Sequence, residues 1–165
     1  MNSNKDVARP ARGIKVSDGD NRLHETLRLE EITPIDYKVS GADTGGDLAI
    51  CVSSNNHKGT GPALHVHPDL DETFFILESE FKYRVGDEFF YLKVGDSIFI
   101  PRNIPHAFTC TSDIPGKLLI VVQPAGKLEE FFRAWSKFDK VTPEIALTLM
   151  MEHNMEVLGP PLTVD

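Results

Sequence analysis

Glycine and proline divide the middle of the chain into short segments rich in Phe, Tyr, Ile and Val. Segments of this kind, bounded by turn residues, are typical of an all-β body. They are DLAICVS, ALHVH, ETFFILE, EFKYRVG, EFFYLKV, SIFIP, HAFTCT and KLLIVVQ. Upstream, HETLRLEEI and DYKVS predict two further strands, divided by Thr33-Pro34. The pattern therefore predicts a compact β domain over residues 13–126.

The alternation of apolar and polar positions is clearest in EFKYRVGDEFFYLKV, residues 80–94. Three apolar side chains alternate there with three charged ones: Phe81, Tyr83 and Val85 with Glu80, Lys82 and Arg84. Gly86-Asp87 follows as a two-residue turn, which favours a β-hairpin. The stretch predicts two antiparallel strands.

The pattern changes to helical spacing after Gly126. The apolar residues that recur at this spacing are Leu128, Phe131, Phe132, Trp135 and Phe138. They predict a helix whose apolar face packs on the β domain, which this spacing favours over the lining of a ligand site. A second helix is expected after Thr142, with Pro143 in its first turn. Residues 127–165 are therefore expected to form a C-terminal helical appendage packed on the barrel.

Composition narrows the class of protein. With 165 residues and 41% hydrophobic content, the chain is long enough for one domain with a sizeable core. Residues 1–12 lack the apolar stretch of a secretory signal and are expected to form a flexible leader. The net charge of −8 disfavours nucleic acid and anionic membranes as partners, and no apolar run is long enough to span a bilayer.

The two cysteines, Cys51 and Cys110, match neither a zinc-ligand spacing nor a dense disulfide framework. A reduced protein in the cytoplasm is the simpler interpretation, although the sequence leaves pairing between the two thiols open.

Candidate chemistry is concentrated in GPALHVHPDLDETFFIL, residues 61–77. On a strand, His65 and His67 point to the same side, so two imidazoles can converge on one ion. Glu72 follows the PDLD turn, where the chain can double back toward them. A third imidazole is offered by His106 in GDSIFIPRNIPHAF. Such a set of nitrogen and oxygen ligands suits a divalent transition metal.

Each of these residues has a simpler interpretation when it is taken alone. A single histidine in a β protein is usually hydrogen-bonded or on the surface, and Glu72 alone would suit a solvated strand end. The grouping of three of the six histidines in two segments bounded by Gly and Pro favours a metal site. The remaining histidines, His24, His57 and His153, are assigned to surface or structural roles.

Both segments resemble the two motifs of the cupin superfamily. The first is similar to Gly59-(x5)-His65-Val66-His67-(x4)-Glu72, and the second to Gly95-(x5)-Pro101-x-Asn103-(x2)-His106-(x3)-Cys110. Beyond the motifs, DTGG, PAGKLEEFFRAW and EVLGPPL resemble the single-domain bacterial cupins described as quercetin 2,3-dioxygenase-like.

The chain departs from these motifs at three positions. Ser79 and Asn103 stand where the family has glycine, and Asn103 can adopt the left-handed backbone conformation. Cys110 stands where an asparagine often ends the second motif, which leaves open what an amide would do there.

The resemblance implies a fold and a cofactor. The fold is the cupin double-stranded β-helix, a jelly-roll-like barrel of two antiparallel sheets, here with C-terminal α-helices. The metal ligands are His65, His67, Glu72 and His106, and they would hold one divalent ion of Fe, Mn, Ni, Co, Cu or Zn. A homodimer is expected, because N-terminal strands could cover a sheet edge of a partner.

The resemblance also implies a dioxygenase that acts with O2 on a flavonol-like or other enolizable small molecule. Glu72 would act as both metal ligand and general base. Two alternatives stay open: a non-redox metal-dependent isomerase, lyase or cyclase, and a non-catalytic small-molecule-binding protein.

A substrate pocket is expected beside the metal. Phe74 and Ile76 share the strand face of Glu72, and Phe108 and Cys110 share that of His106. These four side chains are candidates to line an apolar pocket for a flat ring. For each of them, simple packing in the barrel core is an equally good explanation.

Overall fold

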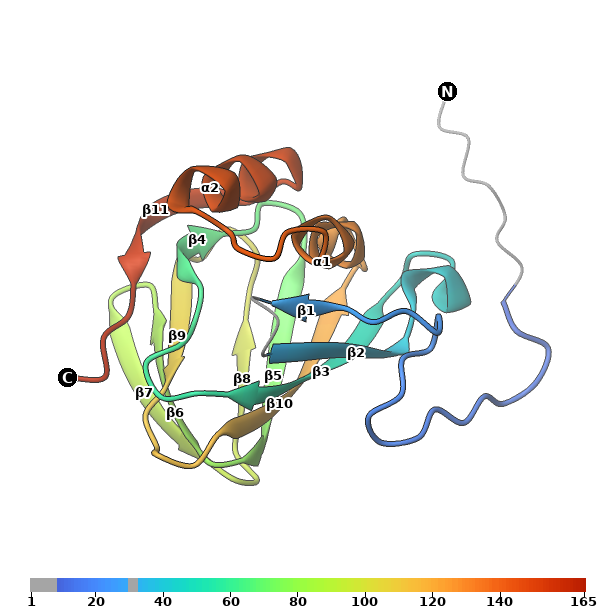
Figure 1. Ribbon diagram of the computed structural model, residues 1–165, viewed down its shortest axis with the longest axis horizontal. Helices are drawn as coiled ribbons and strands as arrows, with labels where there is room; N and C mark the ends of the chain where they lie inside the picture. The colour runs from blue at the N-terminus through green and yellow to red at the C-terminus, as the bar shows by residue number, and fades with distance from the viewer. Residues whose placement is uncertain (1–8, 30–32) are drawn as a thin grey trace.

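The computed structural model describes residues 9–29 and 33–165, which form a barrel of two antiparallel sheets with two helices at one end (Figure 1). The first sheet has the order β1 (Arg28–Leu29), β2 (Thr33–Val39), β3 (Ala49–Asn56), β10 (Gly116–Gln123), β5 (Asp71–Glu78) and β8 (Ser97–Ile100). The second has the order β11 (Glu156–Pro161), β4 (Ala63–Val66), β9 (His106–Cys110), β6 (Glu80–Val85) and β7 (Glu88–Lys93). The expected all-β, jelly-roll-like architecture with C-terminal helices is confirmed.

The core lies between the two sheets, because apolar residues at alternate strand positions point inward. The six-stranded sheet contributes Ile35, Cys51, Phe74, Ile76, Leu118, Ile120 and Val122, and the five-stranded sheet contributes Phe81, Tyr83 and Cys110. Both cysteines are buried and form no disulfide with each other within the part of the chain that the structure describes.

The predicted hairpin is present. Val85 pairs with Glu88 across the two-residue turn, in which Gly86 has a φ of 59°. This backbone conformation is accessible to glycine without a Cβ penalty. The predicted two-residue turn at Gly86-Asp87 is therefore confirmed.

One predicted strand boundary was wrong. Thr33-Pro34 does not divide the upstream strands, because β2 begins at Thr33 and includes Pro34. Proline is tolerated there because it stands at the start of the strand and faces the two-residue edge strand β1. Residues 30–32 of HETLRLEEI and residues 1–8 of the expected leader lie outside the described residues.

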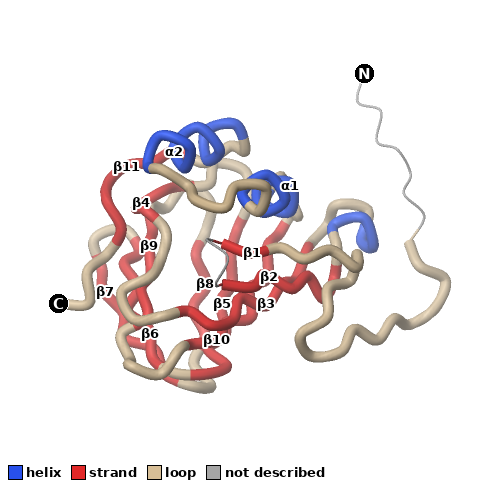
Figure 2. Tube along the Cα trace, in the orientation of Figure 1, coloured by secondary structure: helices blue, strands red, loops and turns tan. Residues whose placement is uncertain are grey.

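The two predicted helices are α1 (Leu128–Trp135) and α2 (Pro143–Glu152), which lie together on one side of the barrel (Figure 2). The Thr142 side chain caps α2 by accepting from the Ile145 amide, and Pro143 occupies the first turn as expected. Helix α1 is shorter than the periodicity predicted, because tight turns at Lys137 and Phe138 end it before Phe138. No helix in the described residues is long and apolar enough to cross a membrane.

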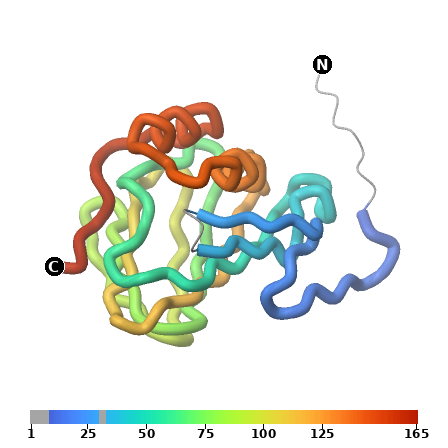
Figure 3. The backbone as a smooth tube through the Cα atoms, viewed as in Figure 1, coloured from blue at the N-terminus to red at the C-terminus, as the bar shows by residue number. Residues whose placement is uncertain are grey.

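The C-terminal region also contains a strand that the sequence did not predict. Residues 156–161 form β11, which runs along β4 (Figure 3). The pairing places Val157 opposite His65. The segment that follows covers the outer face of β6, where the buried Lys82 ammonium donates to the carbonyl oxygens of Thr163 and Asp165. The last part of the chain therefore completes the sheet that carries two of the expected metal ligands.

Candidate metal centre

The structure brings the four predicted ligands together between the two sheets. His65 on β4 pairs with His106 on β9, His67 follows the end of β4, and Glu72 reaches across from β5 of the other sheet. One potential donor atom from each residue lies within 4.8 Å of the others, and all four side chains are buried. Residues that are 41 positions apart in sequence thus form one compact cluster.

Close backbone approach sets the positions of the histidine-bearing strands. A Cβ at Gly61, just before β4, would lie 1.8 Å from the carbonyl oxygen of Phe108 on β9. Only glycine fits at that contact, which holds the start of β4 against β9. The loop before β9 is held by Asn103, whose backbone N–H donates to the His67 carbonyl oxygen at 2.8 Å.

Both departures from the cupin glycine pattern keep the glycine conformation. Asn103 has a φ of 65° and Ser79 a φ of 73°. Asn103 adopts the left-handed conformation expected of it, and Ser79 is further held by its hydroxyl, which donates to the Ile114 carbonyl oxygen at 2.8 Å.

Backbone carbonyl groups orient two of the imidazoles. Nδ1 of His65 lies 2.7 Å from the Ala63 carbonyl oxygen, and Nδ1 of His106 lies 2.9 Å from that of Ile104. Because a carbonyl oxygen can only accept, both Nδ1 atoms carry the proton. Nε2 of each ring is then directed to the centre of the cluster, which is the arrangement that metal-binding histidines use.

Glu72 is the anion of the cluster. Its Oε2 lies 2.8 Å from Nε2 of His106 and 3.5 Å from Nε2 of His67. Burial alone would raise the pKa of Glu72, but the charge of His67 and the hydrogen bond from His106 outweigh it and lower the pKa to about 2. Glu72 is therefore ionised at neutral pH.

The three histidines respond differently to the same surroundings. Burial lowers the pKa of His65, with further lowering by His106 and His67, to about 3. Burial also lowers the pKa of His67. His106 is the exception: burial opposes its protonation, yet the hydrogen bond and charge of Glu72 raise its pKa. Without metal, the cluster therefore holds a neutral His65 and an ion pair between His106 and Glu72.

This donor set fits a divalent transition metal. Ligand atoms about 2.1 Å from a shared ion lie about 3 to 4 Å apart, so the cluster needs only a small contraction to close on one. Three imidazole nitrogens and one carboxylate oxygen suit Fe, Mn, Ni, Co, Cu and Zn, and the ion would replace the proton that His106 shares with Glu72.

An aromatic layer lies next to the cluster. Phe74 and Phe108, two positions beyond Glu72 and His106, have ring centroids 5.5 Å apart, and each is 5.3 Å from the ring of Tyr83. Ile76 and Cys110 lie one layer further along their strands, and the Cys110 thiol points to the carbonyl oxygens of Ser112 and Ile114. Substrate binding by these four residues stays a prediction.

Two tyrosines at the centre of the barrel were missed by the sequence analysis. Tyr83 on β6 and Tyr37 on β2 are both 0% exposed. The alternation of Phe81, Tyr83 and Val85 places Tyr83 on a predicted strand but does not mark it as a candidate site residue. A phenol at a core position is the feature that could have drawn attention to it.

The other histidines lie apart from the cluster. His24 and His57 are exposed, and the His153 ring packs on Phe131 while its Nδ1 contacts the Leu149 carbonyl oxygen at 2.7 Å. Their expected surface and structural roles agree with these positions.

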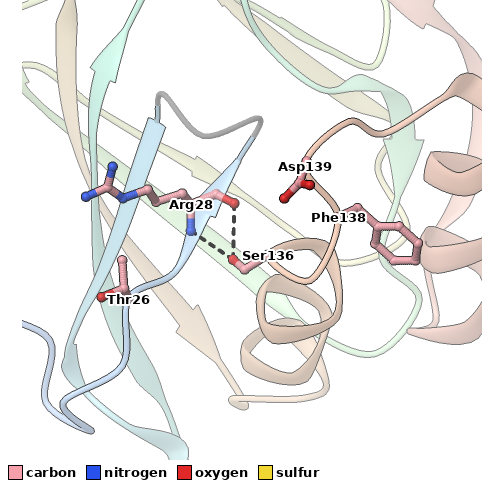
Figure 4. Close-up of a pocket in the computed structure, with 5 residues that line it drawn as sticks. All are labelled: Thr26, Arg28, Ser136, Phe138 and Asp139. Atoms are coloured by element: carbon pink, nitrogen blue, oxygen red, sulfur yellow. Dashed lines mark hydrogen bonds between the residues drawn. The ribbon is translucent and has the colours of Figure 1, made fainter.

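A separate surface hollow of about 190 Å³ lies between β1 and the end of α1 (Figure 4). Its lining is Thr26, Arg28, Ser136, Phe138 and Asp139. The Ser136 hydroxyl connects the two sides of the hollow, because it accepts a hydrogen bond from the backbone amide of Arg28 and donates one to the Arg28 carbonyl oxygen. None of the lining residues belongs to the buried histidine cluster.

Comparison with known proteins agrees with this geometry. The cupin domain model matches residues 55–122, which include all four candidate ligands. An uncharacterized protein of Methanocaldococcus jannaschii is 33% identical over 66 residues, which are 40% of this chain and 53% of that protein. The chain thus spans about half the length of the curated relative that it matches.

Solved structures share the fold. An RmlC-like cupin from Shewanella frigidimarina is 19% identical with a TM-score of 0.54, covering 70% of this chain and 93% of that one. KdgF from Halomonas sp. is 16% identical with a TM-score of 0.53, covering 68% of this chain and 94% of that one. At these identities, the similarity shows a shared fold alone.

Proposed function

Since the chain carries a cupin domain at residues 55–122 and has the fold of the cupin superfamily, we propose that it is a metal-dependent dioxygenase for a small enolizable molecule. The observation that carries this proposal is the buried cluster of His65, His67, Glu72 and His106, in which an ionised carboxylate lies among imidazoles. A carboxylate in such a place can bind a metal and also accept a proton.

A bound transition metal would supply a Lewis-acidic position for a substrate oxygen and, if redox-active, a route for electrons between substrate and O2. Both oxygen atoms of O2 would enter the substrate, so the overall reaction needs no external reductant. The three histidines would hold the ion through Nε2, with two rings fixed by backbone carbonyls.

Glu72 would accept the hydroxyl proton of the substrate when the enol or phenol oxygen of the substrate binds the metal. In the metal-free protein, the same carboxylate oxygen lies 2.8 Å from Nε2 of His106 and 3.5 Å from Nε2 of His67. Metal binding would lower the basicity of the carboxylate, so the transfer requires an acidic substrate hydroxyl.

The size and polarity of the surroundings bear on the substrate. Phe74 and Phe108 would form an apolar wall that keeps water from the reacting atoms. These rings already contact each other, and the ligands are 2–5% exposed. Such dense packing favours a substrate smaller than a flavonol, such as a β-diketone or a hydroxy-ketone.

Oxygen consumption tests the proposal. Metal-free protein would be loaded separately with Fe²⁺, Mn²⁺, Ni²⁺, Co²⁺, Cu²⁺ and Zn²⁺, and O2 uptake measured with acetylacetone, a hydroxy-ketone and quercetin. We expect uptake with at least one redox-active ion and none with Zn²⁺. Glu72→Gln should lower the rate per bound metal at least 100-fold, since general-base catalysis typically contributes 10²–10⁴-fold.

His57→Gln is the control, because His57 is exposed and lies outside the cluster. Conversion of a substrate without O2 uptake, equally fast with Zn²⁺, would replace the dioxygenase with an isomerase, lyase or cyclase. Metal binding without any conversion would indicate a binding protein.

A further inference from the structure

Two hydroxyl groups inside the barrel are left without partners by the protein itself. Neither Tyr83 nor Tyr37 forms a hydrogen bond through its hydroxyl with any described residue, although both side chains are fully buried. A buried donor without a partner lowers the stability of the folded state. Phenylalanine would fill almost the same space without that cost, so the packing alone gives no reason for the two oxygens.

Tyr83 lies in the layer next to the metal cluster. Its ring packs against those of Phe74 and Phe108, which stand two positions from Glu72 and His106 on their strands. On β6 and β9, Tyr83 pairs with Phe108 in the register that pairs Val85 with His106. The Cα atom of Tyr83 is thus one strand layer, about 6 to 7 Å along the backbone, from that of Val85, which pairs with the ligand position His106.

Tyr37 belongs to the opposite sheet. It pairs with Cys51 on β3, and its ring lies 6.4 Å from that of Phe132 on α1. Burial raises the pKa of both phenols, and the charge of Glu72 adds to the shift in each case. The titratable and charged groups around Tyr37 also include Cys51, Glu129 and Arg133. Both hydroxyls therefore stay protonated and can donate hydrogen bonds. The charge of Glu72 acts on both of them.

We propose that the hydroxyls of Tyr83 and Tyr37 donate hydrogen bonds to oxygen atoms of the small molecule that binds at the metal. The inference rests on the proposed metal site and narrows its substrate class. The substrate would carry at least two oxygen functions: one binds the metal, and another, a carbonyl or carboxylate oxygen, accepts from a tyrosine. A hydrocarbon ring with a single hydroxyl would leave the donors unpaired.

The stability of the metal-free protein provides the first test. Tyr83→Phe and Tyr37→Phe each remove one oxygen, and Tyr91→Phe is the matched control, because Tyr91 is 72% exposed on β7. Since the buried hydroxyls have no partner to lose, both core variants should unfold at the same temperature as the wild type or at a higher one. A clearly lower melting temperature in both would show that the hydroxyls serve the fold and would overturn the inference.

Ligand binding to the cobalt-loaded protein provides the second test. Acetohydroxamate offers two oxygen atoms and azide offers none, and binding of either would be followed through the visible spectrum of Co²⁺. We expect acetohydroxamate to bind about tenfold more weakly to Tyr83→Phe or Tyr37→Phe, because a hydrogen bond to a charged group is lost. Cobalt and azide affinities should not change, and Tyr91→Phe should behave as the wild type.

The cobalt-loading and ligand-binding results test the metal site and the role of the tyrosine hydroxyls separately. Wild-type protein that cannot be loaded with cobalt contradicts the metal site itself. Cobalt-loaded wild type that binds acetohydroxamate no more tightly than both tyrosine variants do contradicts the role of the hydroxyls alone. Cobalt-loaded wild type that binds no acetohydroxamate contradicts that role too.

Discussion

His65 shows how a single buried side chain couples the cluster to the stability of the fold. Its folded-state pKa is lowered to about 3 by burial and by the neighbouring histidines, whereas an unfolded chain has a histidine pKa near 6.5. Between these values the unfolded chain binds a proton that the folded protein does not. Stability is therefore lost as the pH falls below about 6.5.

This dependence can be measured on metal-free protein by urea unfolding at pH 7 and pH 5. Wild-type protein should lose about 1–2 kcal/mol more over this range than His65→Gln, whose side chain does not titrate. His57→Gln, with an exposed site, should lose as much as the wild type. Equal losses in wild type and His65→Gln would show that the imidazole is not held neutral.

The cluster of four candidate ligands could be predicted from sequence because its signal is local. The period of two places His65 and His67 on one face, and Gly, Pro and the spacing mark the second segment. The tyrosine hydroxyls could not be predicted in the same way, since alternation indicates that Tyr83 points inward but not whether its oxygen finds a partner. That depends on side chains from other strands, such as Phe74 on β5 and Phe108 on β9.

At the scale of the elements, the approach of β4 to β9 positions His65 beside His106. Gly61→Ala would place a methyl group 1.8 Å from the Phe108 carbonyl oxygen, so the strands must separate. We expect a loss of about 1–3 kcal/mol in unfolding free energy and a weaker affinity for metal. Isothermal titration with Co²⁺ and urea unfolding measure the two effects.

Gly13→Ala is the control, because nothing lies within 4 Å of the added carbon. Metal affinity that is unchanged in Gly61→Ala would contradict the role given to this contact.

Helix α1 is fastened to the barrel by a buried carboxylate. Glu129 accepts from the Ser40 hydroxyl at 3.0 Å, from the Gly41 amide at 3.1 Å and from Arg133 at 2.5 Å. Glu129→Ala leaves these donors unpaired and should lower the unfolding free energy by about 2 kcal/mol or more. The exposed neighbour Glu130→Ala should change it by less than about 0.5 kcal/mol in the same urea titration. Similar losses in both variants would argue against this anchor.

The elements that sequence predicted well are those whose pattern is complete in itself, such as the hairpin at Gly86 and the capped helix at Thr142. Strand β11 was missed because Gly159 and two prolines interrupt its alternation, and its place depends on the free edge of β4. The end of α1 and the inclusion of Pro34 in β2 likewise depend on tertiary contacts. The predicted homodimer and the division at residue 126 stay predictions.

At the scale of the whole molecule, a metal would connect the two sheets, since Glu72 comes from one and the histidine strands from the other. An ion that binds only the folded state stabilises it by mass action, by about 2.7 kcal/mol at 100 times its dissociation constant. We therefore expect Co²⁺ or Zn²⁺ to raise the melting temperature of metal-free protein by several degrees, and EDTA to reverse the rise. A melting temperature that does not respond to metal would contradict this coupling.

The most direct measurement is the metal content of untagged protein after loading and gel filtration, determined by elemental analysis for the wild type, His106→Ala and His57→Ala. The cluster predicts about one equivalent of a divalent transition metal in the wild type and in His57→Ala, and a loss of most of it in His106→Ala. Folded wild-type protein that retains no metal, or a His106→Ala variant that retains a full equivalent, would contradict the assignment of these four residues as one metal site.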